Sequence, residues 1–103
     1  MTFNEYQNAA MRTAIFTHPF YPAASLMIEA AELADLLAKP LLRGDAKGCQ
    51  RSDIVSEAGD VLWNLAALLA DQGITLAEVA ERNIEKLADR AARGVLAGSG
   101  GDR

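Results

Sequence analysis

The sequence predicts an all-α fold, and three observations carry that prediction. Apolar residues make up 50% of the chain and aromatic residues only 6%, and the apolar content is mostly alanine and leucine, which favour helix over strand. No segment shows the sustained alternation of apolar and polar residues that a half-buried strand requires. Capping and helix-ending residues divide the chain into four helical stretches, so the simplest architecture is a four-helix bundle.

The first two helices are bounded by a capping box and by prolines. Thr2 and Glu5 have the spacing of a capping box, which opens a first helix that runs toward Thr17. An aromatic and proline-rich segment then interrupts the chain. A second helix is predicted to start after Pro22 and to stop just before Pro40, because a residue that precedes proline is pushed out of the helical region.

The third helix follows a predicted loop over residues 43–51 that contains two glycines. Ser52 or Asp53 can cap this helix, and Gly73 suits the left-handed conformation that ends it. The turn to the next helix, over residues 73–74, is short. We therefore expect the third and fourth helices to pack as an antiparallel hairpin.

The fourth helix opens with a second capping box, Thr75 and Glu78, and ends near Gly94. The glycine-rich segment that follows is predicted to be frayed. The sequence thus predicts a single domain over residues 1–95 and a flexible C-terminal tail over residues 96–103.

Charge and cysteine content exclude several classes of function. Ten Lys and Arg against 14 Asp and Glu give a net charge of −4 and a pI near 4.8, so nucleic acid is not an expected partner. Cys49 cannot form an internal disulfide, and with His18 as the sole histidine it cannot build a structural zinc site. No apolar run approaches the ~20 residues that span a bilayer, and no secretion signal is evident. The sequence predicts a cytoplasmic protein with no membrane partner.

The second and third helices repeat one another. Glu29–Leu33 aligns with Glu57–Val61, and an apolar stripe of identical spacing runs along each helix. The two stripes are Leu26, Ala30, Leu33 and Leu37, and Ile54, Ala58, Val61 and Leu65. These stripes predict the core-facing sides of both helices.

Each helix carries a pair of carboxylates beside its stripe. At about 100° per residue, Glu29 and Glu57 lie about 70° from the centre of the stripe, and Glu32 and Asp60 about 130° from it on the same side. Like charges one turn apart repel each other, and neither pair has a basic residue three or four positions away. A hard cation bound by oxygen ligands, Mg²⁺ or Mn²⁺, would relieve that repulsion. The alternative is a pair of solvated acidic faces.

A pattern over most of the chain, from about Ala24 to Gly94, resembles a known family. The matching residues are Glu29-x-x-Glu32, then Glu57-x-x-Asp60 in the context Glu57–Trp63, then Asn83, Lys86 and Arg90. Together they resemble the MazG-like members of the all-α nucleoside triphosphate pyrophosphohydrolases. The resemblance implies hydrolysis of a nucleoside triphosphate between the α and β phosphates, which gives a monophosphate and pyrophosphate.

The resemblance also implies roles for these residues. Mg²⁺ would be held by four carboxylates that also serve catalysis: Glu29, Glu32, Glu57 and Asp60. Asn83, Lys86 and Arg90 would bind the substrate, and they lie within roughly 60° of one another on the fourth helix. Beside them runs a predicted core stripe of Leu76, Ala80, Ile84, Leu87 and Ala91. The alternative for this helix is a solvated face held by ordinary ion pairs.

Other residues are weaker candidates for substrate contacts. Asn64 follows Asp60 by one turn and either supports a ligand, touches the sugar, or is incidental. Trp63 lies opposite the core stripe, where a subunit interface is a better explanation than base stacking. The segment 18–22, with His18, either recognises the base or plugs the end of the bundle.

The sequence therefore predicts a Mg²⁺-dependent nucleoside triphosphate pyrophosphohydrolase, with Mn²⁺ as a possible substitute. A homodimer or homotetramer should complete the sites, because one chain has too few helices to enclose a nucleotide. A di-iron carboxylate bundle is disfavoured because such sites use two Glu-x-x-His pairs and the chain has one histidine. The remaining alternative is a non-catalytic helical module that senses nucleotides or binds a protein.

Overall fold

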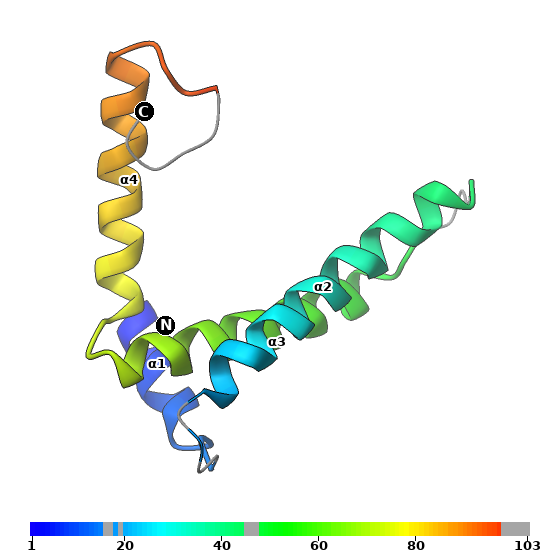
Figure 1. Ribbon diagram of the computed structural model, residues 1–103, viewed down its shortest axis with the longest axis horizontal. Helices are drawn as coiled ribbons and strands as arrows, with labels where there is room; N and C mark the ends of the chain where they lie inside the picture. The colour runs from blue at the N-terminus through cyan, green and yellow to red at the C-terminus, as the bar shows by residue number, and fades with distance from the viewer. Residues whose placement is uncertain (16–17, 19, 45–47, 98–103) are drawn as a thin grey trace.

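The computed structural model describes residues 1–15, 18, 20–44 and 48–97, and these form four helices and no strand (Figure 1). The helices are α1 (Phe3–Met11), α2 (Tyr21–Leu42), α3 (Arg51–Asp71) and α4 (Leu76–Ala92). The predicted fold class and the number of helices are confirmed. Within the described ranges, no helix combines the length and the apolarity that crossing a bilayer requires.

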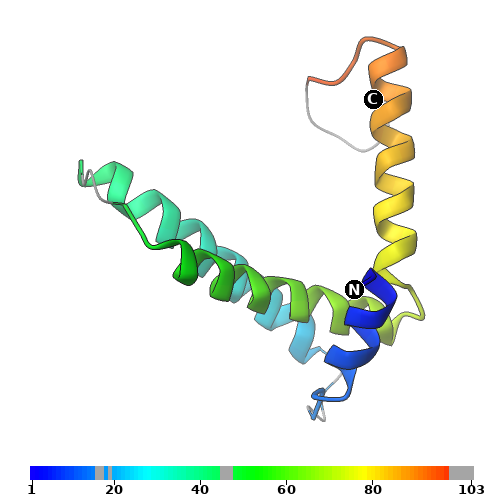
Figure 2. The same ribbon diagram turned by 180° about the vertical axis from the view of Figure 1, so that it is seen from behind.

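The principal packing is between α2 and α3, which lie side by side in opposite directions (Figures 1 and 2). The short helix α1 crosses the end of this pair and contacts both α3 and α4. Helix α4 points away from the pair. The prediction that the third and fourth helices form the antiparallel hairpin is therefore wrong, and the second and third helices form it instead.

A buried glutamine on α1 fixes the direction in which α4 leaves α3. Gln7 is only 6% exposed. Its Nε2 donates to the carbonyl oxygens of Ala66 at 3.1 Å and Ile74 at 3.2 Å, while its Oε1 accepts from the backbone N–H of Leu76 at 2.9 Å. That N–H belongs to the first turn of α4 and has no partner within the helix. One side chain thus joins α1, the end of α3 and the start of α4.

The start of α1 follows the prediction and its end does not. The Thr2 hydroxyl accepts from the Glu5 N–H at 3.1 Å, and the Glu5 carboxylate accepts from the Thr2 N–H at 2.9 Å, which completes the capping box. The helix ends at Met11, well before Thr17, which lies outside the described residues. The Thr13 hydroxyl donates to the Ala10 carbonyl at 2.7 Å, which satisfies an acceptor that a longer helix would use.

Helix α2 includes both prolines that were predicted to bound it. Pro22 lies in the first turn, where the missing N–H has no intrahelical acceptor to lose. Pro40 lies in the last turn, where it removes one backbone hydrogen bond. The helix still closes, because the Arg43 N–H donates to the Lys39 carbonyl at 3.0 Å. Prolines near helix ends therefore did not stop the helix.

Helix α3 begins one or two residues before the predicted caps. Gln50 is its N-cap and makes no side-chain capping bond, so Ser52 and Asp53 lie inside the first turn. The end follows the prediction. Gly73 has a φ of +70°, and the Ile74 N–H donates to the Leu69 carbonyl at 2.9 Å, the pattern of a Schellman motif.

Helix α4 has the predicted bounds. The Thr75 hydroxyl accepts from the Glu78 N–H at 3.1 Å at its start. Gly94 has a φ of +72°, and the Val95 N–H donates to the Arg90 carbonyl at 2.9 Å at its end. Of the segment predicted as a flexible tail, residues 98–103 lie outside the described residues.

The core of one chain is small. Among the described residues, the buried apolar side chains are Ala10, Pro22, Ala66, Ala67 and Leu76. The predicted core stripe of α4 is not buried beyond its first turns, since Ile84 is 65% exposed and Leu87 39% exposed. No helix of the same chain covers that face, so the four helices do not close into a bundle within one chain.

Candidate active site

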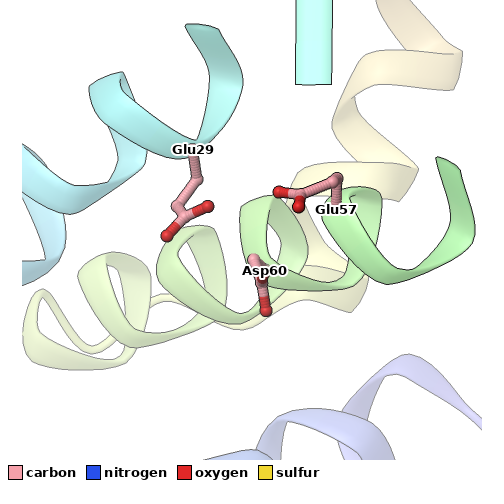
Figure 3. Close-up of side chains that lie close together, drawn as sticks. All are labelled: Glu29, Glu57 and Asp60. Atoms are coloured by element: carbon pink, nitrogen blue, oxygen red, sulfur yellow. The ribbon is translucent and has the colours of Figure 1, made fainter. Parts of the chain in front are cut away.

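The antiparallel pairing of α2 and α3 brings three of the predicted carboxylates together. Glu29 on α2 faces Glu57 and Asp60 on α3, and one carboxylate oxygen from each lies within 4.8 Å of the others. Figure 3 shows the carboxylates of Glu29 and Glu57 pointing toward each other across the space between the two helices, with Asp60 one turn further along α3.

The burial of the carboxylates follows their angle on each helix. Glu29 and Glu57, nearer the apolar stripe, are half-buried, whereas Glu32 and Asp60 are exposed. Oε2 of Glu29 and Oε2 of Glu57 are inaccessible to solvent, and no described residue donates a hydrogen bond to either. Two buried charged oxygens without a donor are costly, because each has lost its hydration without a replacement.

The electrostatic environment disfavours the charged form of Glu29. Burial raises the pKa of the Glu29 carboxyl, and the neighbouring carboxylate of Glu32 raises it further, as do Asp60 and Glu57. Burial likewise raises the pKa of the Tyr6 hydroxyl, with a smaller effect from Asp60. Each shift has the direction expected of a partly dry groove with an excess of negative charge.

The donor set suits a hard divalent cation. Mg²⁺ binds oxygen at about 2.0–2.1 Å, so opposite ligands of one ion lie roughly 4 Å apart. One oxygen of each carboxylate already lies within 4.8 Å of the others, which is close to that spacing. None of the ion pairs among the described residues neutralises the cluster; the nearest along α2 joins Lys39 to Asp35 at 2.6 Å.

Glu32 lies beside the cluster. It is close enough to Glu29 to hydrogen-bond with it and raise its pKa. Together with Glu57 it lines a separate shallow cavity of 310 Å³. The structure thus brings together three of the four predicted ligands and places the fourth next to them.

A cavity of 530 Å³ opens beside the carboxylates. Its lining comes from the residues that follow α1, from the segment before α2, and from the facing sides of α2 and α3. The lining residues are Thr13, Ile15, His18, Tyr21, Ser25, Glu29, Asp60, Trp63 and Asn64. The lining combines carboxylates with aromatic rings, so the cavity suits a ligand that has a charged part and a flat apolar part.

Trp63 lines this cavity. It is half-buried, and its Nε1 donates to the Thr13 hydroxyl at 2.9 Å. Thr13, which follows α1, thus contacts the side of α3 that lies opposite its predicted apolar stripe. The subunit interface at Trp63 stays a prediction.

His18 lines the cavity with its orientation set by the backbone. Its Nδ1 accepts from the Phe20 N–H at 3.2 Å, so the neutral ring carries its proton on Nε2. The Phe20 ring lies 5.3 Å from the imidazole and is 72% exposed. Of the segment predicted to recognise a base, His18 and Tyr21 reach the cavity.

Asn64 is the most buried of the predicted substrate contacts, at 4% exposure. Its Nδ2 donates to the Asp60 carbonyl oxygen at 2.8 Å, while its Oδ1 has no donor among the described residues.

The predicted phosphate-binding residues of α4 do not reach the carboxylates of the same chain. Asn83 and Lys86 line a different cavity, of 300 Å³, together with Ile74, Glu78, Val79 and Arg82. Arg90 is 8% exposed, and it does not line the carboxylate cavity. Within one chain the structure therefore separates the acidic and basic halves of the predicted site.

Sequence reasoning missed several residues of the site. Ser25 precedes Glu29 by four residues, so helical spacing could have placed it on the same face. Thr13 and Tyr6 carry no such signal, because their position depends on how α1 crosses α3.

Comparison with known proteins agrees with this geometry. The family model of the MazG nucleotide pyrophosphohydrolase domain matches residues 22–94. The chain is similar to the Gene 37 protein of Mycobacterium phage L5, with 37% identity over 95% of this chain and 96% of that protein. It is also similar to the protein YvdC of Bacillus subtilis (strain 168), with 32% identity over 70% of this chain and 74% of that protein. No solved structure matches the chain.

Proposed function

The chain belongs to the MazG nucleotide pyrophosphohydrolase family, and on that premise we propose that it hydrolyses a nucleoside or deoxynucleoside triphosphate at the α–β phosphate bond. The products are the nucleoside monophosphate and pyrophosphate, and the reaction depends on Mg²⁺, for which Mn²⁺ can substitute. One observation supports the proposal most. Glu29 and Glu57 each hold a buried carboxylate oxygen without a donor, and they belong to a carboxylate cluster of which Glu29 and Asp60 line the cavity.

The carboxylates would hold Mg²⁺ through Glu29, Glu57 and Asp60, with Glu32 as a further ligand or as a neighbour that orients Glu29. Bound there, Mg²⁺ supplies polarisation of the phosphoryl oxygens and lowers the pKa of water. Because the carboxylates are fixed on two packed helices, they would hold the bound phosphates in one orientation. Water would then attack the phosphorus from one direction.

The other end of the cavity would hold the nucleoside. The ring of Tyr21 offers a face on which a base can stack, and Trp63 lines the cavity one turn along α3 from Asp60. The Nε2–H of His18 offers a donor to an oxygen or ring nitrogen of the base.

The basic residues of α4 would come from a second copy of the chain. A triphosphate carries about four negative charges, and among the described residues of one chain no Lys or Arg lines the carboxylate cavity. Lys86 and Asn83 lie on a helix whose apolar face is uncovered. A homodimer or homotetramer would cover that face and bring the phosphate-binding groups to the carboxylates.

Release of pyrophosphate from the common ribo- and deoxyribonucleoside triphosphates, with and without Mg²⁺ or Mn²⁺, tests the proposal. Asp60→Ala should abolish turnover, because it removes a ligand, and should leave the helical circular dichroism spectrum intact. Asp71→Ala removes an exposed carboxylate from the end of the same helix and should retain activity.

Near-normal pyrophosphate release by Asp60→Ala in Mg²⁺ would show that the site is assigned wrongly. Nucleotide binding without pyrophosphate release by the wild-type protein would instead favour the non-catalytic nucleotide-sensing module.

A further inference from the structure

The side chains that line the 530 Å³ cavity change in chemical type along the two helices. On α2, Glu29, Ser25 and Tyr21 are spaced four residues apart, so they succeed each other by about 6 Å along the helix. On α3, Asp60 is followed one turn later by Trp63 and Asn64. Because the two helices are antiparallel, both sequences run away from the carboxylates in the same direction (Figure 1).

Three zones result. The carboxylates form the first, Ser25 and Asn64 form a polar zone about 6 Å further along, and Tyr21 and His18 lie beyond it. A nucleotide presents phosphate, sugar and base in this same order. The polar zone therefore lies where the sugar of a bound nucleotide would be.

The side chain of Asn64 has a defined polarity in this zone. The carbonyl oxygen of Asp60 can only accept, so the 2.8 Å contact fixes Nδ2 toward α3 and leaves Oδ1 as the free end of the amide. Oδ1 is inaccessible to solvent and has no donor among the described residues. A buried acceptor in this state calls for a donor supplied by the ligand.

We propose that Asn64 Oδ1 accepts a hydrogen bond from a hydroxyl of the sugar, and that this contact makes the enzyme select substrates that carry this hydroxyl. The inference rests on the proposed function, since it assigns the middle of the same cavity. It names Asn64 as a specificity-determining residue for the sugar, whereas the aromatic zone reads the base.

The test compares kcat/KM for triphosphates of one base with different sugars. The wild-type enzyme should hydrolyse a substrate that carries the contacted hydroxyl about tenfold or more faster than the 2′,3′-dideoxynucleotide, because the latter leaves Oδ1 unpaired. The ribonucleotide and the 3′-deoxyribonucleotide then show which of the two hydroxyls is read.

A variant isolates the contribution of the amide. Asn64→Leu keeps a side chain of similar size and helix preference but removes the acceptor. It should bring the preference for the substrate with this hydroxyl over the dideoxynucleotide to within about threefold. Asn8→Leu alters an exposed asparagine on α1 and should keep the wild-type preference. If the larger side chain of Asn64→Leu impairs folding, Asn64→Ala is used in its place. The comparison of sugars with the wild-type enzyme tests the proposal without any variant.

The outcomes separate the two proposals. Equal kcat/KM for the ribo-, 2′-deoxy-, 3′-deoxy- and 2′,3′-dideoxynucleotides in the wild type overturns the sugar contact and leaves the hydrolase intact. The sugar contact is also overturned if Asn64→Leu removes a preference for one base and keeps the sugar preference. That result would assign the amide to the base. Failure to release pyrophosphate from any triphosphate overturns the proposed function, and this inference with it.

Discussion

Among single residues, Glu29 has the least favourable electrostatic environment. Its Oε2 is buried without a donor, and three other carboxylates, those of Glu32 on α2 and of Glu57 and Asp60 on α3, surround it. A cation or a proton relieves the conflict, so the two compete for the same oxygens.

The pH dependence of stability follows from the sign of the Glu29 shift. Its pKa is raised above the ordinary 4.5 in the folded protein. Above pH 4.5 the unfolded chain releases this proton while the folded state retains it. The stability of the metal-free protein should therefore fall as pH rises from 4.5 through the raised pKa, and level off above it.

Thermal unfolding of the metal-free protein across this pH range measures the effect. Glu29→Gln should flatten the decline and raise the melting temperature at neutral pH, and added Mg²⁺ should stabilise the wild type most at the upper end of the range. Glu81→Gln changes an exposed carboxylate of α4 and should behave as wild type. An unchanged pH profile of stability in Glu29→Gln would show that the pKa of this carboxyl is not raised in the folded protein.

The sequence predicted much of the site at this scale and missed its lining. Helical spacing alone placed Glu29 and Glu57 nearer the core than Glu32 and Asp60, and their exposure follows that order. The hydrogen bond from Trp63 to Thr13 could not be predicted, because it joins residues that are brought together only by the crossing of α1 over α3.

At the level of elements, α1 acts as a bracket between α3 and α4. Its Gln7 side chain makes three hydrogen bonds to backbone groups near the α3–α4 turn. Nothing in the sequence marked this glutamine, because its partners are backbone atoms about sixty residues away. The prediction of an α3–α4 hairpin was wrong for the same reason. The sequence indicates the length of the turn, but not the direction in which Gln7 fixes α4.

Gln7→Leu should destabilise the fold by about 2 kcal/mol or more, since it buries the Leu76 N–H and the Ile74 carbonyl without their partners. The free energy of unfolding in urea measures this loss. Gln72→Leu, at the exposed end of α3, should change stability by less than about 0.5 kcal/mol. Equal effects of the two substitutions would contradict the bracket.

At the scale of the whole molecule, the sequence predicted which faces are apolar but not what covers them. Helices α2 and α3 pack against each other, but the predicted core stripe of α2 is only partly buried, since Ala30 and Leu37 are exposed. The stripe of α4 is buried at Leu76, but further along the helix Ile84 is exposed among the described residues, and exposed Met27 and Ile28 on α2 add to the uncovered apolar surface. A chain with so few buried apolar residues gains stability by burying these faces against another copy.

Mixing two inactive variants tests whether the site is shared between copies. Asp60→Asn removes a carboxylate, and Lys86→Ala removes a predicted phosphate-binding group of α4; each should be inactive alone. If α4 of one copy serves the carboxylates of the other, a mixed dimer contains one intact site, and random reassociation restores about a quarter of wild-type activity. The subunits are unfolded and refolded together, and pyrophosphate release is measured against each variant refolded alone. A mixture no more active than its parts would mean that Lys86 serves the carboxylates of its own chain, which would require α4 to turn back onto α3.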